Sequence, residues 1–154
     1  MFLAKSIEDI NINNIFQGEK IKNTIIEDSE FVKIFYSDKN IVLKGIIVIC
    51  PLYVDYDNYP KNKVLLCRNK NKNIVQKIIS LEESILNNFL HFGIPRYTIS
   101  EQLANNLIPL YNQSKNKTNI KYIIKISGIW INNNQYGLTF KFLEVKELSI
   151  GNKL

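Results

Sequence analysis

The sequence predicts an α+β domain built on a small, partly open antiparallel β-barrel, with two helices inserted before the last β-hairpin. Three observations favour this class: β-forming residues dominate from Phe31 to Ile49, a helical pattern follows from Ser80, and a β pattern returns at Ile120. The length of 154 residues suits one domain. We expect that domain to span residues 1–150, and residues 151–154 to form a frayed tail.

A β-hairpin is predicted first. Phe31–Tyr36 is rich in β-forming residues, Ser37–Asn40 supplies residues typical of turns, and Ile41–Ile49 follows as a longer strand. Gly45 interrupts that second strand, which indicates a bulge or a sharp bend of the kind that curved sheets require. A short third strand, Lys63–Cys67, leads into a basic run.

Two helices are predicted next. Ser80–Glu83 matches a capping box, apolar residues recur after it at helical spacing, and Gly93 ends the pattern. Residues 73–79 are candidates for a helical turn that precedes this helix. Thr98–Glu101 matches a second capping box, and Pro109 is expected to end or kink the second helix.

The C-terminal third contains the clearest hairpin pattern. Its strands are Ile120–Ile131 and Tyr136–Val145, and the polar residues 132–135 connect them. The full order is therefore three strands, two helices and two strands. An OB-fold has a helix at the corresponding place, between its third and fourth strands, so this order favours an OB-like barrel. Other antiparallel α+β sheets remain as alternatives.

Side-chain alternation predicts a register for this last hairpin. The apolar sets of the two strands share a face only if Lys125 lies opposite Lys141 and Ile124 lies opposite Phe142. This register requires an odd number of loop residues or a bulge, and the bulge is expected at Gly128. Because two lysines directly opposite one another repel, we expect their face to contact phosphate.

Charge and composition narrow the function classes. Twenty Lys and Arg residues against fourteen Asp and Glu give a net charge of +6, which favours an anionic partner and most often nucleic acid. The abundance of Ile, Asn and Lys is also typical of AT-rich coding, which weakens this argument. We find neither a signal-peptide pattern nor an apolar run that could span a membrane, so we expect a cytoplasmic protein without a membrane partner. Cys50 and Cys67 are expected to be reduced residues in apolar surroundings.

No pattern in the sequence predicts catalysis. His91 has no partner at metal-ligand or catalytic spacing, and the six glycines are scattered singly, so no phosphate loop is present. Asp55 and Asp57 are candidate metal ligands, but two carboxylates alone are a weak signal. We therefore expect no catalytic residue, no metal and no cofactor.

Aromatic and basic residues interleave in a way that is typical of proteins that bind single strands. Aromatic rings stack bases, which contributes about 1–3 kcal/mol per base, and cations follow the phosphates. Packing in the core is the alternative role of each ring. The candidate nucleic-acid-binding residues are Tyr53, Tyr56, Tyr59, Lys61, Lys63, Arg68, Lys70, Lys121, Lys125, Trp130, Tyr136 and Lys141.

The last hairpin also resembles part of a known family. Ile126–Trp130 followed by Tyr136–Phe142 is similar to a C-terminal hairpin of single-stranded DNA-binding proteins of large DNA viruses and of related cytoplasmic linear plasmids of the yeast killer-plasmid type. The resemblance implies a replication-associated protein that binds single-stranded DNA and has no catalytic activity. It implies contacts to DNA for Trp130, Tyr136 and Lys141 only.

The leading hypothesis is a non-sequence-specific single-stranded DNA-binding protein that acts in DNA replication. Its expected partner is single-stranded DNA or RNA, and copies of itself or replication proteins are further candidates. The alternative is a structural or protein-interaction component of a viral or plasmid replication complex, without direct contact to nucleic acid. A third hypothesis is a small enzyme with a metal held by Asp55 and Asp57.

Overall fold

Two long antiparallel strands form the centre of the main sheet. The computed structural model describes residues 4–39, 41–55, 63–109 and 120–146. β10 (Ile120–Asn132) pairs with β11 (Gln135–Lys146) along its whole length. Asn133 and Asn134 join the two strands, and both have positive φ angles, 49° and 61°, as a type I′ turn requires. Asn adopts this left-handed backbone more readily than most residues, which explains the polar connection seen in the sequence.

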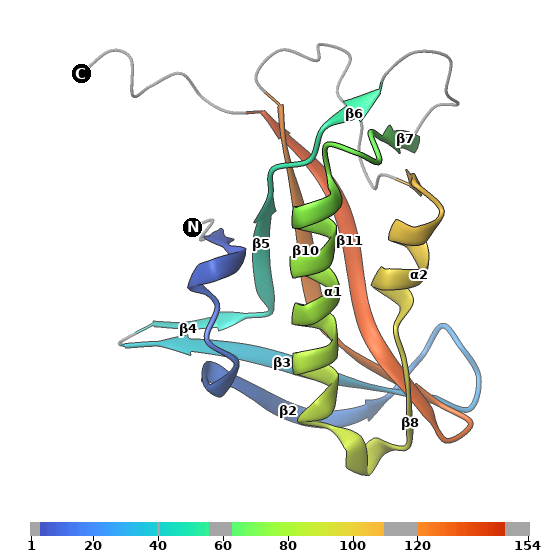
Figure 1. Cartoon of the computed structure of the whole chain (residues 1–154). Coiled ribbons are helices and arrows are strands. Elements are labelled where there is room, and N and C mark those ends of the chain that lie inside the picture. The colour runs from blue at the N-terminus through green and yellow to red at the C-terminus, as the bar shows by residue number, and fades with distance from the viewer. Residues whose placement is uncertain (1–3, 40, 56–62, 110–119, 147–154) are drawn as a thin grey trace.

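Two strands share the opposite edge of β10. Its first half pairs with β5 (Ile46–Cys50) and its second half with β3 (Ser29–Asp38), both antiparallel. β3 extends beyond β10 and is flanked there by β2 (Ile15–Lys22) and β4 (Ile41–Lys44). Figure 1 shows the result: β2, β3 and β4 cross the lower end of the molecule, whereas β5, β10 and β11 run upward from it.

Short elements complete the architecture. β1 (Lys5–Ser6) lies parallel to β5, and β8 (Ile94–Arg96) lies parallel to β11. A separate small sheet contains β6 (Val54–Asp55), β7 (Lys63–Leu66) and β9 (Leu107–Pro109), with β7 in the middle. The described residues also form the single-turn 3-10 helices η1 (Ile7–Asp9), η2 (Ile12–Asn14) and η3 (Leu90–Phe92).

Gly45 separates β4 from β5 and lets the chain change partners. Its φ angle is +82°, and a side chain at this position would place Cβ 2.6 Å from the carbonyl oxygen of Ile126. The Gly45 N–H donates to the carbonyl oxygen of Ile34 at 2.9 Å. Because only glycine adopts this backbone without strain, the chain can leave β3 here and join β10. The bend expected at Gly45 is confirmed.

The register of the β10–β11 hairpin is also confirmed. Lys125 lies opposite Lys141 and Ile124 lies opposite Phe142. The connection has two residues, an even number, so the parity of the apolar sets must be restored within a strand. A bulge between Ile126 and Gly128 does this.

Two helices cover one face of the sheet. Figure 1 shows α1 (Lys72–Asn87) lying across β10 and β11, with α2 (Thr98–Ala104) beside it. The buried Ile85 and Leu86 of α1 and the inward residues of both long strands belong to one core cluster. Burial of these apolar side chains is the main force that holds the helical layer on the sheet.

The helix boundaries differ from those that the sequence predicts. α1 begins at Lys72, so the expected capping box at Ser80 lies in the middle of the helix. The apolar spacing simply continues backward through Ile78, which is 2% exposed. α2 ends at Ala104, well before Pro109, because Asn106 turns the chain with a φ angle of 57° and the following residues pair with β7.

A carboxylate from α1 caps α2. Tyr97 is the N-cap residue of α2 and provides no side-chain hydrogen bond. Instead, the buried Glu82 side chain accepts hydrogen bonds from the N–H groups of Ile99 (2.8 Å) and Ser100 (2.9 Å), and from the Ser100 hydroxyl (2.6 Å). The capping box expected at Thr98 is therefore wrong, because a residue of another helix takes its place.

The structure confirms the mixed α+β class, with strands predominating and both helices before the last hairpin. In the described part of the chain, the main sheet is not closed into a barrel. None of the helices in that part is long and apolar enough to cross a membrane.

Candidate nucleic-acid interface

The face of the main sheet opposite the helices carries aromatic rings. We call it the outer face. On β3, Phe31, Lys33 and Phe35 point to this side, while the residues between them are buried in the core. Trp130 lies opposite Phe31 in the ladder, so the two share this face. Phe16 lies opposite Phe35 in the same way. The aromatic platform consists of Phe16, Phe31, Phe35 and Trp130.

Three of these rings lie over glycines of the neighbouring strand. A Cβ atom added to Gly137 would lie 2.7 Å from Cζ2 of Trp130. At Gly128 the added atom would lie 2.5 Å from Cζ of Phe31, and at Gly18 it would lie 2.6 Å from Cε2 of Phe35. The rings therefore occupy the space that side chains would otherwise fill.

This arrangement holds the rings down on the sheet. A ring that covers a glycine packs one side against the backbone and leaves the other toward solvent. Trp130, Phe31 and Phe35 are accordingly half-buried, whereas Phe16, which has no such glycine, is 54% exposed. The platform thus offers aromatic surface to a planar ligand.

Lysines surround the platform. Lys33 lies opposite Gly128 and Lys44 lies opposite Phe35, both on the outer face, and both are exposed. Lys125 and Lys141 extend the positive surface along the central hairpin. Within the described residues, no Asp or Glu takes a paired outer-face position on these strands. Lysines therefore outnumber acidic side chains at these paired positions, which favours an anionic ligand.

The expected site residues divide between this face and other places. Trp130, Lys125 and Lys141 lie on the outer face, as does Lys121 toward the far end of β10. Lys141 and Lys121 also have interactions within the protein. Tyr56, Tyr59 and Lys61 lie outside the described residues, so their roles remain predictions.

Tyr136 is a correction. Its side chain is fully buried, and its hydroxyl donates to the carbonyl oxygen of Leu86 at 2.6 Å. Burial raises the pKa of this phenol above its ordinary value. The ring anchors α1 to β11 and has no exposed surface on which a base could stack. Tyr136 therefore belongs to the core and not to the site.

The remaining expected residues lie around the small sheet. Tyr53 is 58% exposed, and the Lys70 ammonium lies 5.7 Å from the centre of its ring. Lys63 is exposed at the start of β7. With its amide oxygen turned toward Arg68, Asn106 accepts from the guanidinium Nε at 2.9 Å, so the segment that follows β7 is held against the turn that follows α2.

Sequence reasoning missed Phe16, Phe31, Phe35, Lys33 and Lys44. The signal was present in β3, where the aromatic–lysine–aromatic series at alternate positions contrasts with the aliphatic residues between them. The contribution of Phe16 had no comparable signal, because the irregular pairing of β2 with β3 between Gln17 and Lys20 interrupts its alternation. The glycines beneath the rings come from other strands, which only the register reveals.

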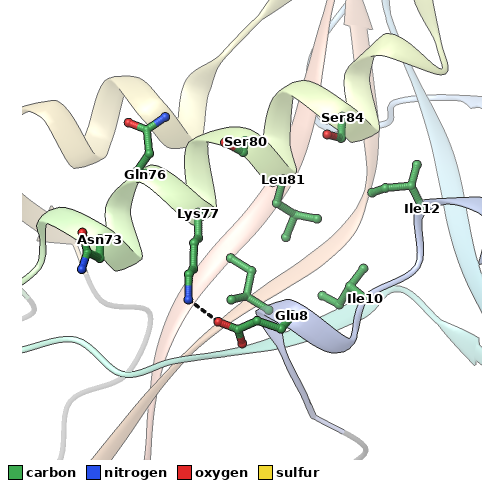
Figure 2. Close-up of a pocket in the computed structure, with 10 residues that line it drawn as sticks. Glu8, Ile10, Ile12, Asn73, Gln76, Lys77, Ser80, Leu81 and Ser84 are labelled. Atoms are coloured by element: carbon green, nitrogen blue, oxygen red, sulfur yellow. Dashed lines mark hydrogen bonds and ion pairs between the residues drawn. The ribbon is translucent and has the colours of Figure 1, made fainter.

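A groove lies on a different side of the molecule, between α1 and the η1–η2 segment. Figure 2 shows its apolar floor, to which Ile10, Ile12 and Leu81 contribute, and the ion pair between Glu8 and Lys77 at its rim. Its volume is about 560 Å³. The groove holds no pair of carboxylates and no activated nucleophile, so its geometry favours no particular chemistry.

The structure describes the surroundings of two titratable groups, Cys50 and His91. Burial raises the pKa of the Cys50 thiol to about 12, so it is protonated at neutral pH and is a poor nucleophile. His91 is exposed and lies against Phe92, with ring centres 4.1 Å apart. No cluster of three His, Cys, Asp or Glu side chains occurs in the part of the chain that the structure describes. Asp57 lies outside the described residues, so the metal site at Asp55 and Asp57 remains a prediction.

Comparison of the chain with protein-family models, with curated proteins and with solved structures finds no match. The resemblance of the last hairpin to viral and plasmid single-stranded DNA-binding proteins therefore remains a prediction.

Proposed function

We propose that this protein binds single-stranded DNA on its outer face without sequence specificity. The aromatic platform is the observation that carries this proposal, because four rings share one face with exposed lysines. Bases stacked on such rings contribute about 1–3 kcal/mol each, and lysines neutralise phosphates. The resemblance of the last hairpin agrees with the proposal and adds an expected role in the replication of a viral or plasmid DNA in the cytoplasm.

The arrangement favours a single strand over a duplex. Bases in a duplex are stacked on one another, so their faces are not available to aromatic side chains. A duplex is read along its grooves by protruding helices or β-ribbons, whereas the rings of the platform lie down on the sheet. Stacking and phosphate contacts do not involve the 2′-hydroxyl group, so we expect RNA to bind through the same surface.

Curvature supports the same proposal. OB-like domains bind single strands on a curved sheet, and we propose that this sheet acts in a comparable way although it is open. The bulge between Ile126 and Gly128 and the bend at Gly45 supply the curvature. The bulge and the bend lie between the platform and the Ile120 end of β10.

Substitution of a platform ring tests the proposal. We expect Phe16→Ala and Trp130→Ala to weaken binding of a 20-nucleotide oligo-dT by about 1–3 kcal/mol each. Leu90→Ala is the matched control, since Leu90 is 57% exposed but lies on η3, which follows α1 and contributes no ring to the platform. Anisotropy of a labelled oligonucleotide gives the affinities, and circular dichroism verifies the fold. Equal affinity in all three variants would contradict the proposal.

One observation favours the alternative of a protein-interaction component. Ile41 and Val42 of β4 are 47% and 67% exposed, and among the described strands β4 pairs with β3 alone. A partner protein could add a strand to such an edge. Absence of oligo-dT binding at low salt would favour this function over the first.

A further inference from the structure

Outside the platform, the aromatic side chain of Tyr53 lies beside two hollows, one of which reaches the Ile120 end of β10. Tyr53 lines both of them, with volumes of about 390 Å³ and about 320 Å³. Ile49 and Pro51 line both, so the two hollows adjoin at Tyr53. Each has a volume within the range of sites that hold small ligands, roughly 300–1,000 Å³.

A buried amide fixes the backbone that presents this ring. The Tyr53 N–H donates to Oδ1 of Asn71 at 2.8 Å, and Nδ2 of Asn71 donates to the Tyr53 carbonyl oxygen at 2.6 Å. Asn71 is only 1% exposed, whereas Tyr53 is 58% exposed. The exposed ring therefore projects from a firmly held segment, which reduces the entropy that a ligand must remove on binding.

The surroundings of the ring are cationic. Lys70 lies over the Tyr53 ring, Lys121 lines the first hollow and Lys77 lines the second. Glu8, which is paired with Lys77, is the one acidic side chain among the described residues that line the two hollows. An aromatic ring with an excess of lysines suits a ligand that is both planar and anionic.

Two residues that line the first hollow, Ile49 and Lys121, lie on the outer face. Ile49 lies opposite Ile123 and Lys121 lies opposite Val145, both on that face. Trp130 comes nine positions after Lys121 on β10, which corresponds to about 30 Å at a strand rise of about 3.3 Å per residue. A single strand that contacts both the platform and Tyr53 must therefore extend over about this distance.

We propose that Tyr53 and Lys70 form a second nucleotide subsite, in which a base stacks on the Tyr53 ring and a neighbouring phosphate lies near Lys70. This inference rests on the proposed function, since the same single strand occupies both sites. It predicts a length requirement: a strand that occupies only the platform gains nothing from Tyr53.

A length series tests the subsite. We expect Tyr53→Ala to weaken binding of a 20-nucleotide oligo-dT by about 5- to 150-fold, the loss of one stacked base, and to leave binding of a 3-nucleotide strand unchanged. Lys70→Gln should reduce the salt dependence for the long strand by about 0.7 in log–log slope. Leu90→Ala is again the control for an exposed apolar side chain outside both sites.

The outcomes separate this inference from the proposed function. If the wild-type protein binds the long strand and Trp130→Ala weakens it while Tyr53→Ala does not, the subsite is wrong and the platform stands. An equal loss for both strand lengths in Tyr53→Ala would also overturn the subsite, because it would indicate a change in the platform itself. If the wild-type protein binds no strand at all, both are wrong.

Discussion

Three of the four platform rings lie over a residue that has no side chain. Gly137 lies beneath Trp130, and its added Cβ would approach the indole to within 3 Å at three atoms. Real Cβ atoms essentially never show contacts this short, so the indole must move if Gly137 is replaced. Glycine at this position therefore acts as a positioning residue, since it sets how the indole lies on the sheet.

We predict that Gly137→Ala lifts the indole away from the sheet. Trp130 is the only tryptophan in the chain, so its fluorescence reports on this one ring. The emission should shift to longer wavelength as the indole becomes more exposed, and affinity for oligo-dT should fall. An unchanged spectrum together with unchanged affinity would contradict the close packing of Trp130 on Gly137.

Glu82 connects α1 to α2, and it makes the free energy of unfolding depend on pH. Burial is the main cause that raises its pKa above the ordinary value of 4.5, and hydrogen bonds from Ser100 and Ile99 offset part of this effect. The Glu82 carboxyl group therefore binds its proton more tightly in the folded protein than in the unfolded chain. Its contribution to the free energy of unfolding is fully present below pH 4.5 and is lost as the pH rises through the raised pKa.

We predict that Glu82→Gln removes this decline. Urea denaturation from pH 4 to pH 7 should give a flatter profile of unfolding free energy for Glu82→Gln than for the wild type. The variant should also be less stable by about 1–3 kcal/mol at low pH, because an amide nitrogen replaces one acceptor beside the α2 N–H groups. Glu83→Gln, on the exposed side of the same helix, is the control. A profile for Glu82→Gln that matches the wild type would contradict this role.

At the scale of elements, the bend between β4 and β5 determines how the two halves of the sheet meet. Gly45 is at φ +82° and is packed against the carbonyl oxygen of Ile126. We predict that Gly45→Ala destabilises the protein by about 1–3 kcal/mol, since a side chain is strained at this φ angle before its close contact is counted. Urea denaturation measures the loss. Wild-type stability in Gly45→Ala would show that the bend does not require glycine.

The sequence was most informative where a period of two could be counted. The register of β10 and β11 and the need for a bulge follow from the alternation of apolar side chains. A shift of one residue in the pairing would turn every apolar side chain of a strand outward. The bend at Gly45 followed from a glycine within a strand pattern. These features depend on local sequence, and the structure confirms them.

Features that depend on distant residues could not be predicted in this way. The cap of α2 comes from Glu82 on another helix, so the apparent capping box at Thr98 was misleading. Tyr136 and Trp130 flank the same turn, yet one is core and the other surface because the bulge and the helical layer decide their environment. The platform itself joins residues of β2, β3 and β10, whose pairing no single segment of sequence specifies.

For the molecule as a whole, the two faces of the main sheet differ in their surroundings. Helices cover one face of the main sheet, and the other face carries the rings and lysines of the proposed interface. The net charge of +6 alone would suit many anionic partners. Its combination with the platform is what favours a single strand, and it implies a binding affinity that depends on salt.

Quenching of Trp130 fluorescence by oligo-dT at several salt concentrations tests the central claim most directly. Because the only tryptophan of the chain lies on the platform, a stacked base should quench its emission in a saturable way. If Lys33, Lys44 and Lys125 each neutralise one phosphate, the affinity should fall with salt at a log–log slope of about −2, at roughly 0.7 per phosphate. Emission that stays constant at low salt while oligo-dT is added would contradict binding on the outer face.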